Sequence, residues 1–336
     1  MPTHVSIVIP AFNQLDCCRQ CIDSVLANTD YPYKLLLVDN GSTDGVSEYF
    51  DSIPDATVIH SETNLGFPAG ANLGLTRADG HVLLLNSDTI VPPGWLSRLV
   101  SALESNRRIG MAGPMSNNVS GPQHLPDARV NNTGDLTIVS ETLWRDYAAS
   151  VDDLERIVGF CMLISEPAFK AIGLLDESFG IGNLEDDDYC LRVKKAGYRV
   201  CMAKGCFVFH YGSRTFQAMG FTSESYRELI HRNESLFNGK WGLDHGQSRT
   251  GQLARRRLHE AQSLQAAGEL KGAVACLAES IAIDPSNPDA FNLLGLLLLA
   301  MGEPDKAVRQ FDRALALDPG HAEALSNRHG ALDSRD

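Results

Sequence analysis

The distribution of apolar residues divides the chain into two parts. In residues 1–240, short apolar runs alternate with helix-like segments. The runs predict strands at 5–9, 34–38, 56–59 and 81–85. The segments between them predict helices at 16–27, 69–77 and 95–104. Because unbroken apolar runs are typical of strands buried on both faces, this order predicts an α/β domain with a mostly parallel sheet and helices on both faces.

After residue 240 the pattern becomes helical and repeats. Gly268-Glu269 recurs as Gly302-Glu303, and Asp284-Pro285 recurs as Asp318-Pro319, with an offset of 34 residues each time. This period is typical of helix-turn-helix repeats. We therefore predict a small all-α helical-repeat domain at 253–336, joined by a polar linker at 241–252. Its expected parts are repeats at about 254–287 and 288–321 and a capping helix at 322–332.

Composition and charge narrow the expected partners and location. The chain of 336 residues has a net charge of -13, and an acidic chain repels phosphate backbones, so we expect no nucleic-acid partner. No run of apolar residues is long enough to span a bilayer, so we expect no transmembrane segment. The N-terminal residues resemble a strand and lack the features of a signal peptide, which favours a cytoplasmic location.

Polar residues follow the predicted strands at the edge where ligands bind to open parallel sheets. Turn formation explains residues 42–45, which follow the second strand. It explains Asp39 and Asp88 less well, because an unpaired carboxylate is costly close to a buried apolar strand. Either residue alone leaves the question open, but the two together favour a binding site.

Six ordered sequence blocks resemble an inverting family 2 glycosyltransferase with the GT-A fold, over residues 4–215. They read VSIVIPAFNQ, LLLVDNGSTDG, NLGFPAGANLGL, LLLNSDTIVPPGW, GFCMLI and LEDDDYCLRVKKAGYRV. The second helical copy has Leu294-Gly295, Ala307 and Phe311 at the spacing of a tetratricopeptide repeat, which it resembles. The first resemblance implies transfer of a sugar from a nucleoside-diphosphate sugar to a hydroxyl of a glycan or protein acceptor, in a single displacement.

The same resemblance implies a nucleotide-sugar site. Its expected residues are Pro10, Ala11, Phe12, Asn13, Asp39, Asn64, Gly66, Asn72 and Ser87. Residues 10–13 would form a wall of the pocket, and residues 64, 66 and 72 would lie near the ribose and diphosphate. Asp39 would accept a hydrogen bond from the base, which favours UDP or dTDP over a guanosine nucleotide.

The resemblance also implies a metal centre. Asn86-Ser87-Asp88 stands at the family's DxD position, with Asn in place of the first Asp, so Asp88 is the expected ligand. His210, in VFHYGS, would complete the coordination, whereas without the resemblance a His satisfied in a turn is favoured. Few protein oxygens together with diphosphate oxygens suit Mn²⁺ or Mg²⁺, and an imidazole ligand favours Mn²⁺.

An acidic run, Glu185 to Asp188, begins a predicted helix that continues to Ala196. Acidic residues at a helix N-terminus complement its dipole, which explains some of the run. The resemblance implies that one of them deprotonates the acceptor hydroxyl. We expect Asp186 in this role, with Glu185 as the alternative.

Two other functional readings remain. The chain could be a catalytically degenerate, sugar-nucleotide-binding scaffold protein, for which Asn86 is the only support in the sequence. A sugar nucleotidyltransferase is less favoured, because no Gly-rich loop with Arg follows the first strand. The repeat domain is expected to bind a protein partner, since the concave faces of such repeats commonly bind peptides. A role in stability or dimerisation is the alternative.

Overall fold

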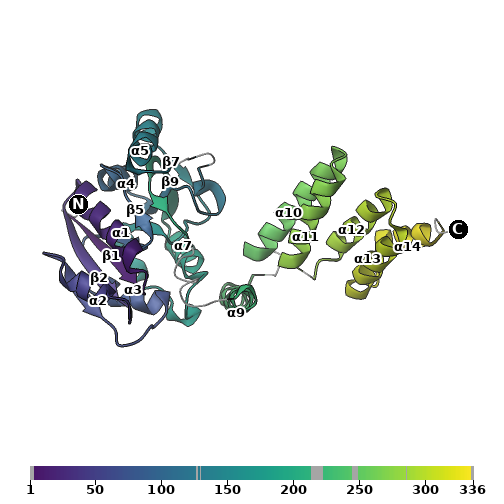
Figure 1. Cartoon of the computed structure of the whole chain (residues 1–336), viewed down its shortest axis with the longest axis horizontal. Helices are drawn as coiled ribbons and strands as arrows, with labels where there is room; N and C mark the ends of the chain where they lie inside the picture. The colour runs from purple at the N-terminus through teal and green to yellow at the C-terminus, as the bar shows by residue number, and fades with distance from the viewer. Residues whose placement is uncertain are drawn as a thin grey trace. The chain divides into compact units, whose positions relative to one another are not determined.

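The computed structural model describes residues 4–125, 128, 130–212, 222–243, 249–284 and 286–333. The chain forms two compact units, Met1–Asn233 and Glu234–Asp336 (Figure 1). The division lies inside helix α9 (Ser223–Trp241), a few residues before the predicted boundary at residue 240. Each unit has its own core, and the two are described separately.

The first unit is built on a mixed sheet. Four neighbouring parallel strands form one half of it: β3 (Thr57–His60), β2 (Tyr33–Asp39), β1 (Val5–Ala11) and β4 (His81–Leu85). They confirm the four predicted strands. Within the described residues the order continues through β8 (Cys161–Ile164), β6 (Ile109–Met115), β9 (Arg199–Phe207) and β7 (Val151–Asp153). β8 runs antiparallel to both β4 and β6, so the sheet is parallel only in part.

Helices cover both faces of this sheet, as predicted. On one face Ile7 and Ile9 pack with residues of α1 (Leu15–Asn28), α2 (Val46–Asp51) and α4 (Trp95–Glu104). On the other face Val8 packs with residues of α3 (Phe67–Leu75), α6 (Glu166–Ile172) and α7 (Glu185–Lys195). Successive side chains of β1 thus enter opposite cores, which explains its unbroken apolarity.

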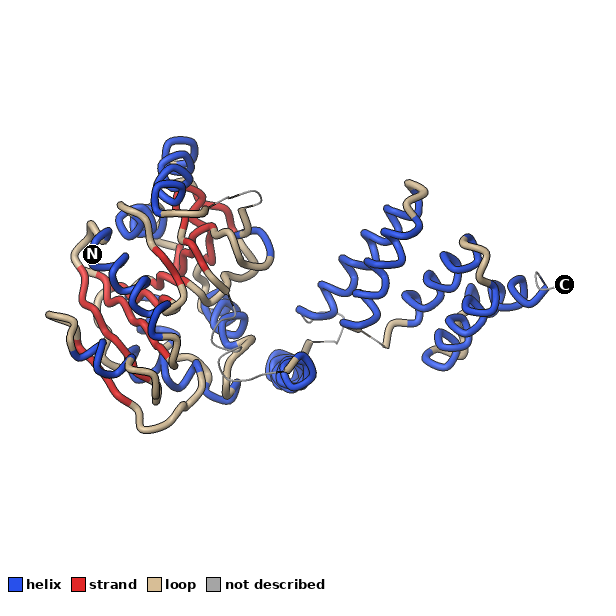
Figure 2. The backbone as a smooth tube through the Cα atoms, in the orientation of Figure 1, coloured by secondary structure: helices blue, strands red, loops and turns tan. Residues whose placement is uncertain are grey.

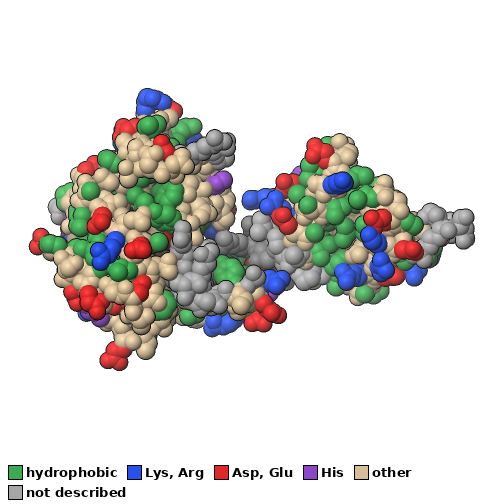
Figure 3. Space-filling view, viewed as in Figure 1, with side chains coloured by type: hydrophobic (Ala, Val, Ile, Leu, Met, Phe, Trp, Pro, Cys, Tyr) green, Lys and Arg blue, Asp and Glu red, His purple; other side chains and the backbone are tan. Residues whose placement is uncertain are grey.

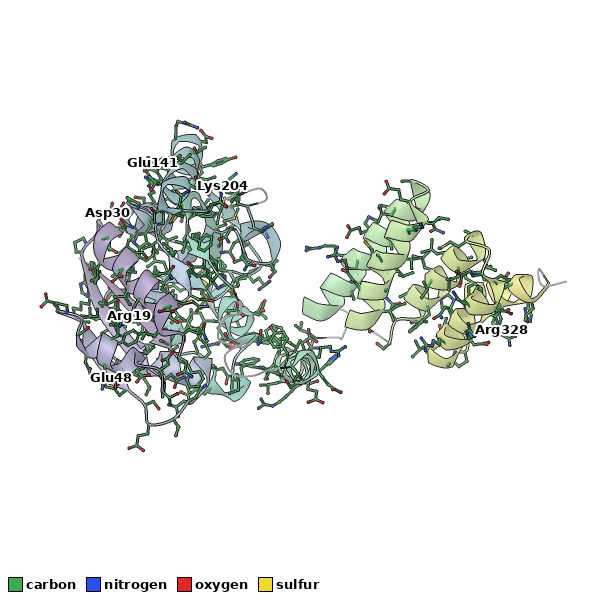
Figure 4. All side chains as sticks on the ribbon, in the orientation of Figure 1. Arg19, Asp30, Glu48, Glu141, Lys204 and Arg328 are labelled. Atoms are coloured by element: carbon green, nitrogen blue, oxygen red, sulfur yellow. The ribbon has the colours of Figure 1, made fainter. Side chains whose placement is uncertain are left out.

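Two further elements complete the first unit near the strand ends. Helix α5 (Thr133–Tyr147) contacts β9, where Lys204 lies 4.8 Å from the ring centroid of Tyr147 (Figure 4). A separate ladder pairs β5 (Thr89–Ile90) with β10 (Phe209–His210) in antiparallel orientation. The ladder joins segments about 120 residues apart in the sequence and sets His210 opposite Thr89.

The second unit is all helical in its described residues (Figure 2). Its helices are α10 (Arg249–Ala266), α11 (Leu270–Ile283), α12 (Pro288–Ala300), α13 (Pro304–Leu317) and α14 (Ala322–Asp333). The predicted helix pairs and final helix are therefore present. Helix α10 begins within the predicted linker, of which residues 244–248 lie outside the described part of the chain.

Two further observations concern the surface charges of the first unit and the apolarity of the helices. Acidic and basic side chains are interspersed on the face of the first unit that Figure 3 draws. No helix in the described part of the chain is long and apolar enough to cross a membrane.

Candidate active site

The β5–β10 ladder brings Asp88 and His210 together. Tyr211 donates its backbone N–H to the Asp88 carbonyl at 3.0 Å, next to the paired residues Thr89 and His210. The two side chains meet beside this bond, with His210 Nε2 3.3 Å from Asp88 Oδ1. Both residues are buried. The two residues that the sequence assigned to one metal centre thus lie in contact.

The surroundings of His210 favour one tautomer of its ring. Nδ1 lies 2.9 Å from the carbonyl oxygen of Asn118, which can only accept a hydrogen bond, so Nδ1 carries the proton. Nε2 then faces the Asp88 carboxylate. It is buried and has no hydrogen-bond partner within the described residues. The ring of Phe160 stacks on the imidazole, with centroids 5.0 Å apart, and limits its rotation.

This pair fits a divalent cation. A neutral imidazole nitrogen and a carboxylate oxygen are both acceptors, and a cation between them satisfies both. Oδ1 of Asn86, two residues before Asp88, is a further buried oxygen without a hydrogen-bond partner in the described part of the chain. No cluster of three or more His, Cys, Asp or Glu side chains that could hold a metal occurs among the described residues. Within those residues Asp88 and His210 are thus the candidate ligands of these types at this place, and an ion there needs further oxygens.

The acidic run begins helix α7, and its members have different neighbours. Asp186 Oδ2 accepts a hydrogen bond of 2.8 Å from the backbone N–H of Gly159. A Cβ on Gly159 would lie 3.2 Å from the Asp186 Cβ, so this close approach favours glycine. Since Gly159 precedes Phe160, consecutive residues contact the acid and the histidine. This dipeptide brings the predicted base and the predicted metal pair to one place.

Two of the three remaining acids lie next to arginines. Asp188 is fully buried and pairs with Arg192 at 2.9 Å, one helical turn away. Asp187 lies 3.4 Å from Arg156 Nε. Glu185 is buried at the start of the helix. Of the two candidate bases, Asp186 is the one with a described contact to the Gly159-Phe160 segment.

The expected nucleotide wall joins the ends of β1 and β2. Pro10 and Ala11 are the last residues of β1, and Phe12 follows, half-buried. Asn13 donates its backbone N–H to Ser42 Oγ at 2.9 Å, and its Oδ1 accepts from the Thr43 N–H at 2.8 Å. These reciprocal bonds hold the two loops side by side at the carboxyl edge of the sheet, as the strand pattern predicted.

Asp39 ends β2 and is almost completely buried. Its Oδ1 accepts a hydrogen bond of 2.9 Å from the backbone of Ser42, and its Oδ2 lies 3.4 Å from His60 Nδ1. Nε2 of the same imidazole is 3.0 Å from Asp51 Oδ1. Burial lowers the pKa of His60, but the hydrogen bonds to Asp51 and Asp39 outweigh it and raise the pKa above its usual value. Asp39 is therefore a fixed carboxylate with a basic neighbour.

Residues 64–72 lie in a tightly built segment. Asn64 Oδ1 accepts from the Gly66 N–H at 2.8 Å, and a Cβ on Gly66 would meet the Gly180 carbonyl oxygen at 2.2 Å. The Asn72 amide exchanges two hydrogen bonds of 3.0 Å with the backbone of Leu175. The described contacts of these three residues are thus within the protein, and they shape the segment around α3.

Helix α1 links the two halves of the site. Cys18 donates to the Asn13 carbonyl and Cys21 to the Asn86 carbonyl, each at 3.6 Å. Burial, the largest cause, raises the pKa of Cys21 to about 12, so its thiol stays protonated and keeps donating. Ser87 is buried beside this helix. The sequence analysis missed these contacts, and it missed Asn117 and Asn118, which contact His210 but look like ordinary turn formers in a polar loop.

Two sequence-family models match parts of the chain. Residues 6–152 match the sequence model described as glycosyl transferase family 2, and residues 264–327 match a tetratricopeptide repeat. The first match includes Asp39 and Asp88 and ends before Asp186 and His210. The roles of the latter two residues therefore depend on the geometry above and on the sequence resemblance.

Several curated relatives share the first unit. An N-acetylglucosaminyl-diphospho-decaprenol L-rhamnosyltransferase of Mycobacterium tuberculosis is 25% identical over 62% of this chain and 75% of its own length. The O-antigen biosynthesis protein RfbC of Myxococcus xanthus is 26% identical over 66% of this chain but 18% of its own length. An uncharacterized protein of Sinorhizobium fredii is matched over 24% of its length. The chain thus spans a quarter or less of two of these relatives.

One solved structure shares the fold. The mannosyltransferase PcManGT of Pyrobaculum calidifontis, solved with GDP-Man and Mn²⁺, matches with a TM-score of 0.51 and 16% identity, over 100% of this chain and 88% of that one. The predicted fold class, a GT-A sheet with flanking helices followed by a helical-repeat region, is confirmed. The chain carries a glycosyltransferase family 2 domain followed by tetratricopeptide repeats.

Proposed function

We propose that this protein transfers a glycosyl group from a nucleoside-diphosphate sugar to a hydroxyl of a glycan or protein, with inversion in a single displacement. One observation carries the proposal. Nε2 of His210 faces Asp88 Oδ1 at 3.3 Å, and the adjoining residues Phe160 and Gly159 contact His210 and Asp186. Two candidate metal ligands and a candidate base are thus connected through one short segment, which supports the proposal.

The donor would bind at the carboxyl edge of β1 and β2. Residues 10–13 would line the nucleotide, and Asp39 would accept a hydrogen bond from the N–H of its base. Since uracil and thymine both offer an imide N–H, UDP or dTDP sugars are favoured. The PcManGT complex contains GDP-Man, so GDP-sugars need testing beside UDP- and dTDP-sugars.

Asp88 and His210 would hold a divalent ion, Mn²⁺ or Mg²⁺. When bound, such an ion offsets the negative charge that gathers on a leaving diphosphate. The sequence resemblance and the two opposed acceptor atoms support this assignment. Mn²⁺ is favoured because imidazole is a better ligand for it than for Mg²⁺.

Asp186 would remove the proton from the acceptor hydroxyl as that oxygen attacks the anomeric carbon. The Gly159 N–H holds one carboxylate oxygen and the Asp187 N–H the other, at 2.8 and 2.9 Å. These bonds fix the direction of the carboxylate and leave each oxygen a further lone pair. General-base catalysis of this kind contributes about 10²–10⁴-fold to the rate. Glu185 is the alternative base.

The test combines binding and turnover in the full chain. Thermal unfolding is measured with UDP-, dTDP- and GDP-sugars, with and without Mn²⁺, because a ligand of the folded state raises the unfolding temperature. We expect a Mn²⁺-dependent shift that Asp88→Ala abolishes. Asp186→Asn should keep that shift but lower donor turnover by about 10²-fold or more.

Three results would change the conclusion. If no sugar nucleotide shifts the unfolding temperature with Mn²⁺ or without it, the proposal fails. If binding occurs without hydrolysis or transfer, the scaffold protein is the better description. If Asp186→Asn turns over normally and Glu185→Gln does not, the base is Glu185.

A further inference from the structure

Two consecutive asparagines, Asn117 and Asn118, follow strand β6 and surround His210. Asn117 Oδ1 accepts a hydrogen bond of 2.9 Å from the backbone N–H of His210. Its Nδ2 donates to the carbonyl of the same residue at 3.1 Å. One side-chain amide thus satisfies both backbone groups of His210, as a neighbouring strand would.

Asn118 fixes the ring and the following residues. Its carbonyl oxygen lies 2.9 Å from His210 Nδ1, and its Nδ2 donates to the Tyr211 carbonyl at 2.7 Å. A Cβ on Gly212 would lie 2.3 Å from Asn118 Nδ2, so this approach requires glycine. The segment 210–212 is therefore held along its whole length by the asparagine pair.

The opposite edge of the same segment is held by the β4–β5 turn. Tyr211 N–H bonds to the Asp88 carbonyl, and His210 lies opposite Thr89. The backbone of His210, its Nδ1 and one face of its ring are thus each held by a contact. Together these contacts direct Nε2 at Asp88 Oδ1. Secondary contacts of this kind set the tautomer and direction of a metal-binding imidazole.

We propose that Asn117 and Asn118 are positioning residues of the metal centre. They hold His210 so that its Nε2 and Asp88 Oδ1 bind the same divalent ion. The inference rests on the proposed function, because it takes these two residues as the ligands of the ion. This role differs from the simple attachment of a loop. The Asn118 carbonyl bonds to Nδ1 of His210 and so leaves Nε2 as the nitrogen that binds the ion.

The first experiment measures the affinity of the full chain for Mn²⁺ alone, by the loss of the free-ion signal in electron paramagnetic resonance. We expect Asn117→Ala to weaken Mn²⁺ affinity about 10- to 100-fold, as removal of outer contacts does in other metal sites. Asn117→Asp keeps the acceptor for the His210 N–H but sets a carboxylate against its carbonyl, so it should also weaken binding. Asn118→Ala keeps the backbone carbonyl and should have a smaller effect.

A matched control removes a similar bond away from His210. Asn28 donates its side-chain N–H to the Val91 carbonyl at 2.9 Å. Asn28→Ala should lower thermal stability while leaving Mn²⁺ affinity at the wild-type value. If folded Asn117→Ala also binds Mn²⁺ like the wild type, the pair has only a structural role and the inference is wrong.

The ligand variants separate this failure from failure of the proposed function. If Asp88→Ala and His210→Ala both bind Mn²⁺ like the wild type, the metal centre itself is wrongly assigned. If these two lose affinity while the asparagine variants keep it, only the positioning role is refuted. The two outcomes therefore cannot be confused.

A second measurement does not depend on the stability of the variants. In metal-free wild-type protein labelled with ¹⁵N-histidine, the shifts of the two His210 ring nitrogens report the tautomer. We expect a protonated Nδ1, held by the carbonyl of Asn118. An Nδ1 without a proton, or a proton that exchanges freely between the two nitrogens, would overturn the proposal.

Discussion

At the residue scale, backbone neighbours decide how the buried histidines of the first unit are protonated. His210 donates from Nδ1 to a carbonyl, whereas His81 Nδ1 faces the backbone N–H of Glu166 at 3.0 Å. Because an N–H can only donate, His81 must accept there, and its other nitrogen lies 3.3 Å from Glu104 Oε1. Burial, the largest cause, lowers the pKa of His81 despite Glu104.

This environment predicts a loss of stability in acid. The pKa of His81 is about 6.5 in the unfolded chain and lower in the folded one. Neutral His81 therefore contributes fully to the free energy of unfolding above about pH 6.5, and this contribution is lost as the pH falls from there through the folded-state pKa. His81→Asn can still accept from the Glu166 N–H but cannot gain a proton. We therefore expect the urea midpoint of this variant to fall less between pH 7.5 and 5.5 than that of the wild type.

An exposed histidine supplies the control for this measurement. His259 lies on the solvent side of α10, so His259→Gln should leave the pH dependence of the first unit unchanged. At pH 7.5, His81→Asn should cost about 1 kcal/mol through the lost contact with Glu104. If its midpoint depends on pH as strongly as that of the wild type, another group causes the acid sensitivity.

At the scale of elements, close backbone approach sets several helix and loop positions. In the second unit α12 and α13 meet at Gly295, where a Cβ would lie 2.3 Å from Phe311 Cε1. Phe311 is fully buried, so its ring has little space to move. The small residue in the repeat pattern is thus required by packing between paired helices and by no ligand.

We expect Gly295→Ala to destabilise the repeat unit by roughly 1–3 kcal/mol, the usual cost of overpacking a core. Gly330→Ala is the matched control, because Gly330 lies in α14 and no atom stands within 4 Å of the added Cβ. Alanine should there stabilise the helix by up to about 1 kcal/mol. Thermal unfolding followed by circular dichroism distinguishes the two, and equal effects of both changes would refute the packing argument.

At the scale of the whole molecule, the chain forms two units with separate cores. The proposed catalytic residues all lie in the first unit, between residues 10 and 210. The tetratricopeptide repeats lie in the second, where such repeats commonly bind peptides. We therefore propose that the second unit recruits a protein partner, which is either a polypeptide acceptor or another enzyme of the same pathway.

A shortened chain tests this division. A chain ending at residue 243, after helix α9, should keep its Mn²⁺-dependent shift with sugar nucleotides and its hydrolysis of the donor. The shortened chain should no longer transfer sugar to the natural acceptor. The measurement follows the transfer of radioactive sugar to the acceptor in cell extract, where the full chain should label it. If both chains label the acceptor equally, the repeats serve stability or dimerisation instead.

The sequence alone determined four strands of the sheet, the helical repeats and the residue types of the candidate site. Short unbroken apolar runs between turn residues are typical of buried strands, and the 34-residue period is typical of stacked helix pairs. Asp39 and Asp88 could be selected as candidate site residues because an unpaired carboxylate close to a buried apolar strand is energetically costly. The strands β6, β7 and β9 were not predicted, because Gly, Pro or charged residues interrupt their apolar pattern. Strand β8 is apolar throughout but has only four residues.

Only the tertiary structure decided which residues meet. The contact between Asp88 and His210 depends on a two-residue ladder across a long sequence separation, and no local pattern encodes such a pairing. The contact of Asp186 with Gly159 and that of His210 Nδ1 with the carbonyl of Asn118 likewise depend on packing between distant segments. Residue types follow from local chemistry, whereas distances and proton positions follow from how distant segments pack.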